Sequence, residues 1–301
     1  MKVNIGKIKL KNPVMAASGT FGYAKEFEKL VHLGGIGAII TKTITLNPKQ
    51  GNPMPRICET SAGLLNAIGL QNEGVDDFIK VKMPYLSKIG VPIIVSISGN
   101  NIDEFFILAR RINKIKSISG IELNISCPNL KTKKLVAQDD KATYEVVKAV
   151  RKVTDKTIIT KLSPNVTDIV EIAEAAESAG SDAVSLVNTF LGMAIDIDAR
   201  KPKLANITGG LSGPCIKPIA LRMVYEVSRN VNIPVIGIGG IMNSDDAIEF
   251  MLAGARAVQV GTANFIEPGV CGKIVKGIEI YLKKHKIEKI EEIVGNLVEA
   301  S

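Results

Sequence analysis

The side chains best suited to chemistry lie together at residues 124–129, which read Asn-Ile-Ser-Cys-Pro-Asn. An apolar segment precedes this run, so we expect Asn124 at a strand end, pointing into the site, and Cys127 on the following loop. A thiol with an ordinary pKa of about 8.5 becomes a competent base where cations stabilise its thiolate, and Lys131 lies nearby in the chain. A free cysteine is also commonly a small packed hydrophobe, so spacing alone leaves both roles open for Cys127.

The histidine and cysteine content excludes several other chemistries. The two histidines, His32 and His285, both fall in charged, helix-like stretches, so a Ser-His-Asp or Cys-His arrangement is not expected. The cysteines are widely spaced and form no Cys-x-x-Cys pair, which argues against a zinc or iron–sulfur site in this chain. We expect no bound metal and reduced thiols at all four positions: Cys58, Cys127, Cys215 and Cys271.

Charge and hydropathy limit the partners. The 301 residues include 38 Lys+Arg and 30 Asp+Glu, a formal net charge of +8, but the lysines are scattered and aromatic residues make up only 4%. An anionic ligand or a lysine-rich surface explains this charge better than nucleic acid does. The longest uncharged apolar run, residues 233–242, is far shorter than the roughly 20 residues that span a bilayer. We therefore expect a soluble, cytoplasmic protein without a membrane partner.

Eight short apolar segments are expected to position this chemistry. They read as fully buried parallel strands because most are continuous apolar runs rather than alternating ones. Helical periodicity separates many of them, for example at 102–115 and 169–179, and a Gly-x-x-Ala joint recurs at Gly35, Gly180 and Gly254. The pattern predicts an α/β fold, a (β/α)₈ TIM barrel forming a single domain over residues 1–301. Residues 43–68 and 190–215 are expected to be long loops over its C-terminal mouth. The eight segments are 13–17, 38–41, 92–97, 120–123, 157–160, 182–187, 234–238 and 257–260.

The residues that follow these strands are mostly polar. Active sites of such barrels assemble at the carboxyl ends of the strands. Asparagine and serine there also satisfy turns, but two lysines converge at the same end, and lysine is rarely buried without an anion. Glycines after the last two strands would expose backbone N–H groups to a phosphate, as in flavin mononucleotide (FMN). The positions are Ser18, Lys42, Asn100, Asn124, Lys161, Asn188, Gly239-Gly240 and Gly261-Thr262.

Together these motifs resemble class 1 dihydroorotate dehydrogenases, and in particular the B type. The resemblance covers nearly the whole chain, with the motifs in the same order and at the same spacing. Ile68, the run Asn188-Thr189-Phe190 and residues 209–214 carry the B-type likeness. The matching runs are 16–22, 41–43, 66–72, 124–129, 161–165, 187–189, 209–214, 239–240 and 261–262.

The resemblance implies an FMN enzyme that oxidises dihydroorotate to orotate in pyrimidine synthesis, with Cys127 as the base. By the same analogy the flavin would be held by Ser18, Lys42, Thr43, Asn100, Asn124, Lys161, Val187, Gly213, Gly239, Gly240, Gly261 and Thr262. The substrate would be held by Lys42, Asn66, Ala67, Ile68, Gly69, Leu70, Asn124, Asn129, Asn188 and Thr189.

B-type enzymes pass electrons to NAD through a second subunit that carries FAD and an iron–sulfur cluster. The resemblance thus implies such a partner, with this chain as a homodimer within a heterotetramer. Three alternatives stay open at this point. They are an A-type homodimer that reduces fumarate, a dihydropyrimidine dehydrogenase-like enzyme, and a non-catalytic phosphate-binding barrel that acts as a sensor.

Overall fold

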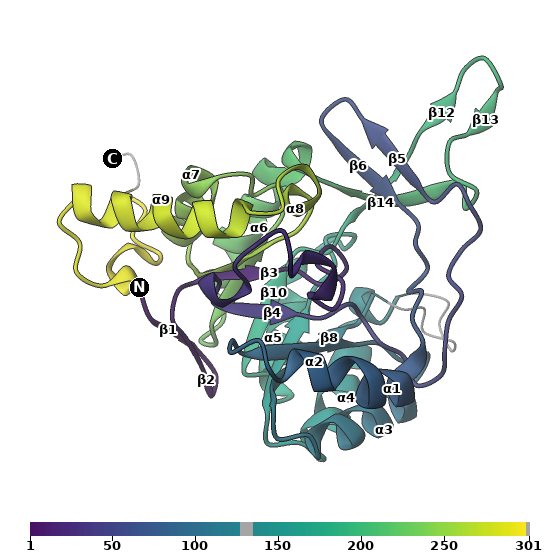
Figure 1. The fold of residues 1–301 in the computed structure, drawn as a ribbon, viewed down its shortest axis with the longest axis horizontal. Coiled ribbons are helices and arrows are strands. Elements are labelled where there is room, and N and C mark those ends of the chain that lie inside the picture. Colours follow the sequence, from purple (N-terminus) through teal and green to yellow (C-terminus); the bar gives the residue numbers. More distant parts are fainter. Residues whose placement is uncertain (127–134, 299–301) are drawn as a thin grey trace.

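A closed eight-stranded barrel forms the centre of the protein (Figure 1). The structure, a computed structural model, describes residues 1–126 and 135–298. The barrel strands are all parallel to their neighbours, and each predicted apolar segment overlaps one of them, which confirms the (β/α)₈ prediction. They are β3 (Val14–Ala16), β4 (Ala38–Ile40), β7 (Ile93–Ile97), β8 (Ile118–Asn124), β9 (Thr157–Lys161), β10 (Ala183–Leu186), β15 (Val235–Ile238) and β16 (Ala255–Val260).

The barrel strands are buried on both faces, as their continuous apolar sequences require. Every residue of β7 and β9 is buried, because one face packs inside the barrel and the other packs against helices. Strand β8 starts two residues before the predicted segment and ends on Asn124, and β9 ends on Lys161. Both polar residues therefore stand at the carboxyl end of the barrel.

Six longer helices surround the barrel, and side-chain caps fix where several of them begin. Asn101, Asp139, Asp168 and Asn243 each accept a hydrogen bond from a backbone N–H of the following first turn. No described helix is long and apolar enough to cross a membrane. The longer helices are α3 (Ile102–Asn113), α4 (Asp140–Arg151), α5 (Ile169–Ser178), α6 (Lys217–Ser228), α7 (Ser244–Leu252) and α9 (Val270–Lys284). Short helical segments are α1 (Gly74–Asp77), α2 (Met83–Leu86) and α8 (Ala263–Ile266), with a π-helix at Phe78–Lys82 between the first two.

The recurrent glycine joint has the predicted geometry at two of its three copies. Gly180 follows α5 with φ of 99°, and Gly254 follows α7 with φ of 115°, the left-handed region that favours glycine. The prediction is wrong at Gly35. That residue ends a 3-10 helix (Leu33–Gly35), and extended Ile36 follows directly, so no left-handed residue is needed.

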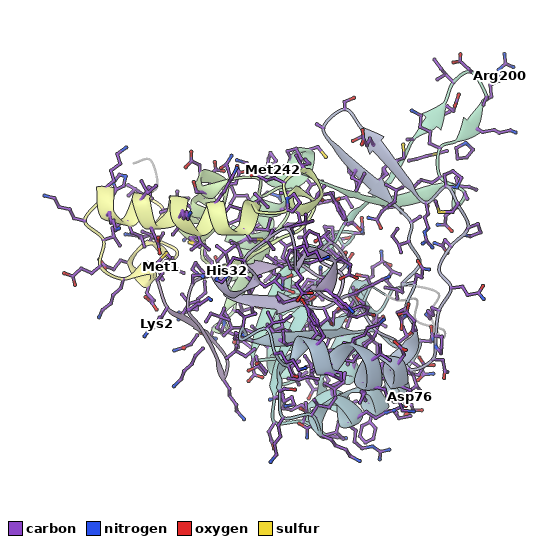
Figure 2. All side chains as sticks on the ribbon, viewed as in Figure 1. Met1, Lys2, His32, Asp76, Arg200 and Met242 are labelled. Carbon is purple, nitrogen blue, oxygen red and sulfur yellow. The ribbon has the colours of Figure 1, made fainter. Side chains whose placement is uncertain are left out.

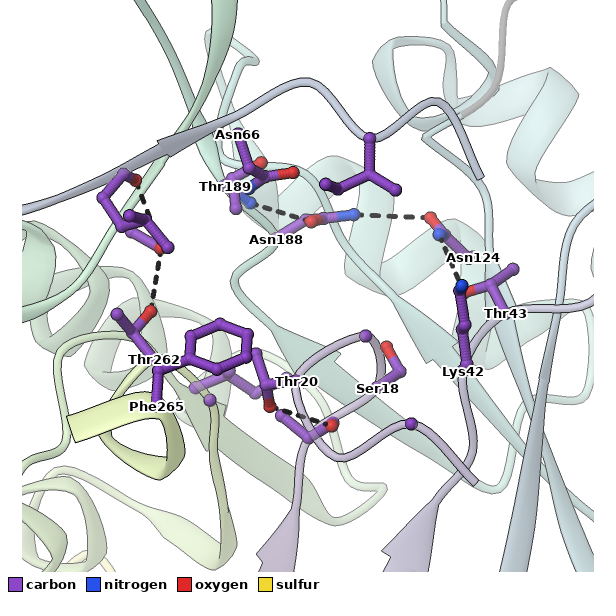
Figure 3. Close-up of a pocket in the computed structure, with 18 of the residues that line it drawn as sticks. Ser18, Thr20, Lys42, Thr43, Asn66, Asn124, Asn188, Thr189, Thr262 and Phe265 are labelled. Atoms are coloured by element: carbon purple, nitrogen blue, oxygen red, sulfur yellow. Dashed lines mark hydrogen bonds between the residues drawn. The ribbon is translucent and has the colours of Figure 1, made fainter. Parts of the chain in front are cut away.

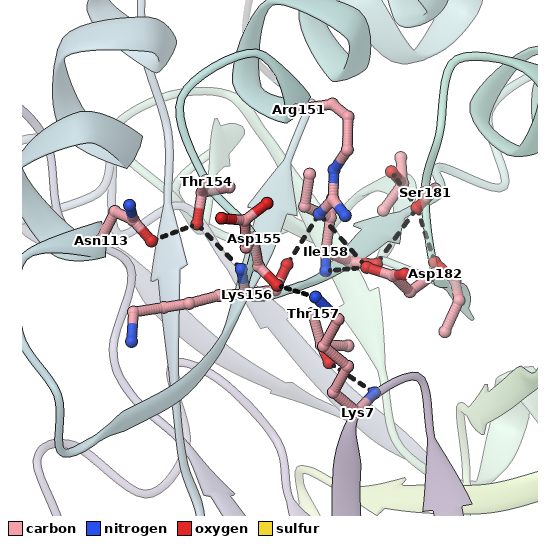
Figure 4. Close-up of polar contacts among 12 residues, drawn as sticks. Lys7, Asn113, Arg151, Thr154, Asp155, Lys156, Thr157, Ile158, Ser181 and Asp182 are labelled. Atoms are coloured by element: carbon pink, nitrogen blue, oxygen red, sulfur yellow. Dashed lines mark hydrogen bonds and ion pairs between the residues drawn. The ribbon is translucent and has the colours of Figure 1, made fainter.

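A hairpin of β1 (Val3–Ile5) and β2 (Ile8–Leu10) lies against the amino-terminal end of the barrel. The backbone N–H of Lys7 donates to Oγ1 of Thr157 at 2.9 Å, at the start of β9 (Figure 4). Beside this contact, Arg151 at the end of α4 pairs with Asp182 at 3.2 Å. These contacts hold the end of the barrel that is opposite the predicted site.

The two segments predicted as long loops over the mouth do lie there, but each also contains strands, which corrects that part of the expectation. Four antiparallel strands in the order β11-β14-β6-β5, here called the mouth sheet, stand over the carboxyl end of the barrel (Figure 1). Leu65, Ala67 and Leu204 form a small apolar cluster of their own in this region. The strands are β5 (Ile57–Thr60), β6 (Gly63–Asn66), β11 (Phe190–Met193) and β14 (Thr208–Ser212). A further hairpin, β12 (Ile195–Asp196) and β13 (Lys201–Pro202), extends outward with Arg200 near its tip (Figure 2).

Candidate active site

A cavity of about 700 Å³ lies between the carboxyl ends of the barrel strands and the mouth sheet (Figure 3). Such cavities at this end of a barrel are the usual ligand sites of the fold. The structure brings nearly all the predicted site residues to its wall. They are Ser18, Lys42, Thr43, Asn66, Ala67, Ile68, Gly69, Leu70, Asn124, Lys161, Val187, Asn188, Thr189, Gly213, Gly239, Gly240, Gly261 and Thr262.

Three predicted residues are not in this set. Cys127 and Asn129 lie outside the described residues. Asn100 is exposed and absent from the cavity wall, because its side chain is used at the start of α3. Its amide nitrogen donates to the carboxylate of Glu104 at 3.0 Å, and its oxygen accepts from Lys49 at 3.1 Å. Position after the strand was therefore not sufficient to place Asn100 at the site.

A chain of amide and hydroxyl groups crosses one side of the cavity. Nδ2 of Asn188 donates to Oδ1 of Asn124 at 3.3 Å (Figure 3). It also donates to Oγ of Ser126 at 2.9 Å. Nδ2 of Asn124 in turn lies 3.4 Å from Oγ1 of Thr43. These bonds join the segments that follow β4, β8 and β10 and orient both amides. The result is a fixed set of donors and acceptors facing the cavity.

Two lysines reach the cavity without a carboxylate partner among the described residues. Lys161 is only 6% exposed, and its Nζ lies 3.5 Å from Oγ of Ser18. The Nζ of Lys42, half-buried after β4, has no hydrogen bond or ion pair to any other described side chain. Buried ammonium groups are costly unless an anion or strong acceptor lies beside them. The cavity therefore suits a ligand with negative charge or carbonyl oxygens.

The glycine turns at the ends of β15 and β16 fit a phosphate. The backbone N–H groups of Gly240, Ile241 and Thr262 donate to no acceptor within the described part of the chain. A Cβ on Gly261 would lie 3.8 Å from both Ala17 and Thr20, which also line the cavity, so an added atom would meet only ordinary van der Waals contacts there. Free N–H groups with room beside them form the kind of cradle that binds a phosphate group.

Several wall residues were not predicted. Tyr23, Arg56 and Phe265 line the cavity, although none of them directly follows a barrel strand. Burial, with Glu73, Asp77 and Glu26 nearby, raises the pKa of Tyr23, so its hydroxyl stays protonated as a donor. Arg56 donates to the side chain of Gln71. These residues could have been found only because they lie within or beside the motif runs and the long segments around the mouth. Nothing else in their local sequence indicates a place in the cavity.

Comparison with known proteins identifies the family. The sequence model of the family described as dihydroorotate dehydrogenase matches residues 1–282. This chain belongs to the dihydroorotate dehydrogenase family. It is 58% identical over 298 residues to a Geobacter sulfurreducens protein named dihydroorotate dehydrogenase B (NAD(+)), catalytic subunit, covering 99% of this chain and 98% of that protein. Proteins with the same name from Geobacter metallireducens and Geotalea uraniireducens are 57% and 55% identical, over 99% of this chain and 98% of each relative.

Membership confirms the resemblance seen in the motifs and makes the chain a flavin-dependent oxidoreductase. Neither histidine lines the cavity, and the described residues contain no group of three or more metal-ligating side chains. Of the described cysteines, Cys58 is half-buried, Cys215 is exposed and Cys271 is buried. The dihydroorotate dehydrogenase cavity thus offers amides, lysines and backbone N–H groups rather than a metal centre.

Proposed function

We propose that this chain is the catalytic subunit of a B-type dihydroorotate dehydrogenase. It would oxidise (S)-dihydroorotate to orotate with FMN as the immediate hydride acceptor and, through a partner subunit, NAD as the final acceptor, in cytoplasmic pyrimidine synthesis. One observation carries the proposal: a single cavity joins the amide cluster and two lysines to the glycine turns. Among the described residues these lysines have no carboxylate partner, and the N–H groups of the turns have no acceptor. The names of the relatives supply the activity.

The substrate would bind to the amide cluster. Dihydroorotate carries ring carbonyls, ring N–H groups and a carboxylate, and Asn124, Asn188 and Asn66 offer both donors and acceptors to them. Lys42 would pair with the carboxylate, since no described carboxylate side chain competes for its ammonium group. Thr189 is held beside these amides, because its backbone N–H donates to Oδ1 of Asn188 at 2.8 Å. The wall formed by residues 66–70 would complete this subsite, together with Asn129, which lies outside the described residues.

The cofactor would lie between this subsite and the glycine turns. Gly213, Gly239, Gly240, Gly261 and Thr262 would hold its phosphate through backbone and hydroxyl donors. When bound, the flavin accepts the hydride that leaves the substrate. Ser18, Thr43 and Val187 would line the ring, and Lys161 would place a positive charge beside it, which favours its reduced, anionic form.

Proton removal would fall to Cys127. The proton at C5 of dihydroorotate is acidic because it lies next to a ring carbonyl, and the Cys127 thiolate would take this proton. The hydride would leave C6, in the same step or in a separate one. Ser126, the residue before Cys127 in the sequence, accepts a hydrogen bond from Asn188 and so belongs to the amide cluster. Holding the ring with C5 toward one group and C6 toward another is the largest contribution of the site.

The partner subunit would carry FAD and the iron–sulfur cluster and would join a homodimer of this chain in a heterotetramer. Two observations support a partner: the relatives are named as catalytic subunits with NAD(+), and the described residues contain no cluster of metal ligands. The A-type and dihydropyrimidine dehydrogenase-like alternatives receive no support from these names.

The test is steady-state turnover of the flavin-loaded chain with an artificial electron acceptor, offered dihydroorotate or dihydrouracil. We expect turnover with dihydroorotate and none with dihydrouracil. The isolated chain should reduce NAD and fumarate only slowly, and reduction of NAD should become fast when an electron-transfer subunit is added. Preference for dihydrouracil would overturn the proposed substrate. Rapid reduction of NAD by the isolated chain would overturn the need for a partner, and a colourless protein would favour the sensor alternative.

A further inference from the structure

An ion pair between half-buried Lys217 and buried Asp246 joins two of the glycine turns from outside the cavity. Lys217 is the first residue of α6, and its Nζ lies 2.6 Å from Oδ1 of Asp246, in the first turn of α7. Glu249, one turn further along α7, is a second acceptor at 3.0 Å. Neither Lys217 nor Asp246 is part of the cavity wall, so they do not contact a ligand there.

Asp246 uses both of its oxygens, one for each turn. While Oδ1 accepts from Lys217, Oδ2 accepts from the backbone N–H of Met242 at 2.8 Å and of Asn243 at 3.2 Å. Met242 lines the cavity and follows the Gly239-Gly240 turn by two residues. Asp246 as a whole is only 8% exposed. Its hydrogen bonds to Met242 and Asn243 fix the backbone of this turn.

Lys217 connects the ion pair to the Gly213 turn through the backbone. Its helix starts directly after the short helical segment Pro214–Ile216, for which Gly213 is the N-cap. A Cβ on Gly240 would lie 2.7 Å from Cβ of Lys217 and 3.0 Å from the carbonyl oxygen of Gly213. The two turns are therefore in direct contact at the point where the ion pair joins their helices. The hydrogen bond to Asp246 also raises the pKa of Lys217.

We propose that Lys217 and Asp246 are positioning residues for the cofactor phosphate, holding the Gly213 and Gly239-Gly240 turns together so that their N–H groups converge. The inference rests on the proposed function, because it takes FMN as the ligand. Other ion pairs in the described chain do not join two cavity turns; Arg222 and Glu226, for example, pair within α6 itself. Loss of the Lys217–Asp246 pair is expected to loosen the phosphate cradle and leave the flavin ring subsite intact.

The experiment compares FMN with riboflavin, which has the same ring system and no phosphate. Both ligands are titrated into the full chain stripped of flavin, with binding followed by quenching of flavin fluorescence. In Lys217→Met and Asp246→Asn, the Kd for FMN should rise by about tenfold or more, since a set of charge-assisted hydrogen bonds becomes misaligned. The Kd for riboflavin should stay within about twofold of the parent value.

Two further variants separate positioning from general stability. Lys217→Arg keeps a donor for both carboxylates and should restore most of the FMN affinity, while Arg222→Met breaks an ion pair on the same helix and should change neither Kd. Equal losses of FMN and riboflavin binding in Lys217→Met, or no loss of FMN binding in either variant, would overturn the inference. If the parent chain itself bound neither flavin, the proposed function would fail instead.

Discussion

The side chains of Asn188 and Asn124 are joined by a hydrogen bond, with Nδ2 of Asn188 donating to Oδ1 of Asn124 at 3.3 Å. Asn124 is the last residue of β8 and Asn188 follows β10, so the two residues are 64 positions apart in the sequence. Because the bond fixes which atom of each amide faces the cavity, it determines the pattern of donors and acceptors offered to a ligand.

Asn188→Ala should therefore impair substrate recognition more than stability. Removing this amide takes away the side-chain donor to Oδ1 of Asn124, which keeps only the backbone N–H of Ser126 at 3.3 Å, and it also frees the Ser126 hydroxyl. We therefore expect kcat/KM for dihydroorotate to fall by about tenfold to a hundredfold, equivalent to roughly 1–3 kcal/mol. Steady-state kinetics measure the effect. Asn230→Ala, which removes an exposed amide at the end of α6, is the control and should leave kcat/KM unchanged. An unaltered kcat/KM in Asn188→Ala would contradict a role in binding.

Lys161→Met should lower the reduction potential of the bound flavin. In the proposed complex the buried ammonium group would stabilise a negative charge on the reduced ring. Its loss is therefore expected to shift the potential by about 30–60 mV to more negative values, roughly 1.4–2.8 kcal/mol for a two-electron couple. Equilibration with a redox dye measures the shift. Lys156→Met removes a half-buried lysine at the other end of the barrel, where its Nζ donates to the carbonyl of Ile118, and should not move the potential. Equal shifts in both variants would show that the location of the charge is irrelevant.

Alanine substitutions at two cavity glycines should separate flavin binding from folding stability, because Gly261→Ala should weaken the first and Gly240→Ala the second. Gly261→Ala meets ordinary contacts of 3.8 Å, so the stability of the flavin-free chain should be unchanged while its methyl group narrows the cavity and weakens FMN binding. Gly240→Ala requires a left-handed backbone at φ of 70° and approaches Lys217 to 2.7 Å, so it should destabilise the chain by at least about 1 kcal/mol. Urea unfolding of the flavin-free variants and flavin titration separate the two effects. A strongly destabilised Gly261→Ala would show that the space above Gly261 is already filled.

Cys271 should make stability depend on pH in the alkaline range. Burial raises the pKa of its thiol to about 12, from an ordinary value of 9.0, and Sγ lies 3.4 Å from Oδ1 of Asn264. In the unfolded chain this thiol ionises first as the pH rises above 9.0, so the free energy of unfolding should fall between these two values. Cys271→Ala should flatten that decrease in urea unfolding measured at several pH values. An unchanged slope would mean that Cys271 does not ionise on unfolding in this range.

The barrel could be predicted from the sequence because its strands are buried on both faces and give continuous apolar runs. The mouth sheet could not be predicted, since β14 reads Thr-Gly-Gly-Leu-Ser and pairs with β6, where Gly210 and Asn66 are 144 positions apart. Glycine-rich composition indicates loops when the partner strand is unknown. Long-range pairing therefore decided the structure of this region.

For the site as well, residues at strand ends could be predicted from the local sequence, whereas residues on loops could not. The strand-end rule found Lys42, Lys161 and the two amides, because a barrel fixes where strand ends meet. It was wrong in placing Asn100 at the cavity, because the adjacent cap of α3 and Glu104 hold that side chain elsewhere. Tyr23 and Arg56 reach the cavity through loops, whose paths the local sequence does not specify.

Cys127→Ser should keep the flavin and lose most turnover near neutral pH. A serine hydroxyl is far more weakly acidic than a thiol, so it supplies almost no base at that pH. The visible spectrum of the purified variant measures flavin content, and turnover with an artificial acceptor measures catalysis. Near-parental turnover would exclude Cys127 as the base.

The central claim is that one cavity holds a flavin and dihydroorotate in contact. Anaerobic titration of the purified, flavin-loaded chain with dihydroorotate tests it most directly, with the visible flavin absorbance as the readout. We expect the absorbance to bleach in proportion to added dihydroorotate, with one orotate formed for each flavin reduced. A flavin-loaded chain whose spectrum stays unbleached at excess dihydroorotate would contradict the account.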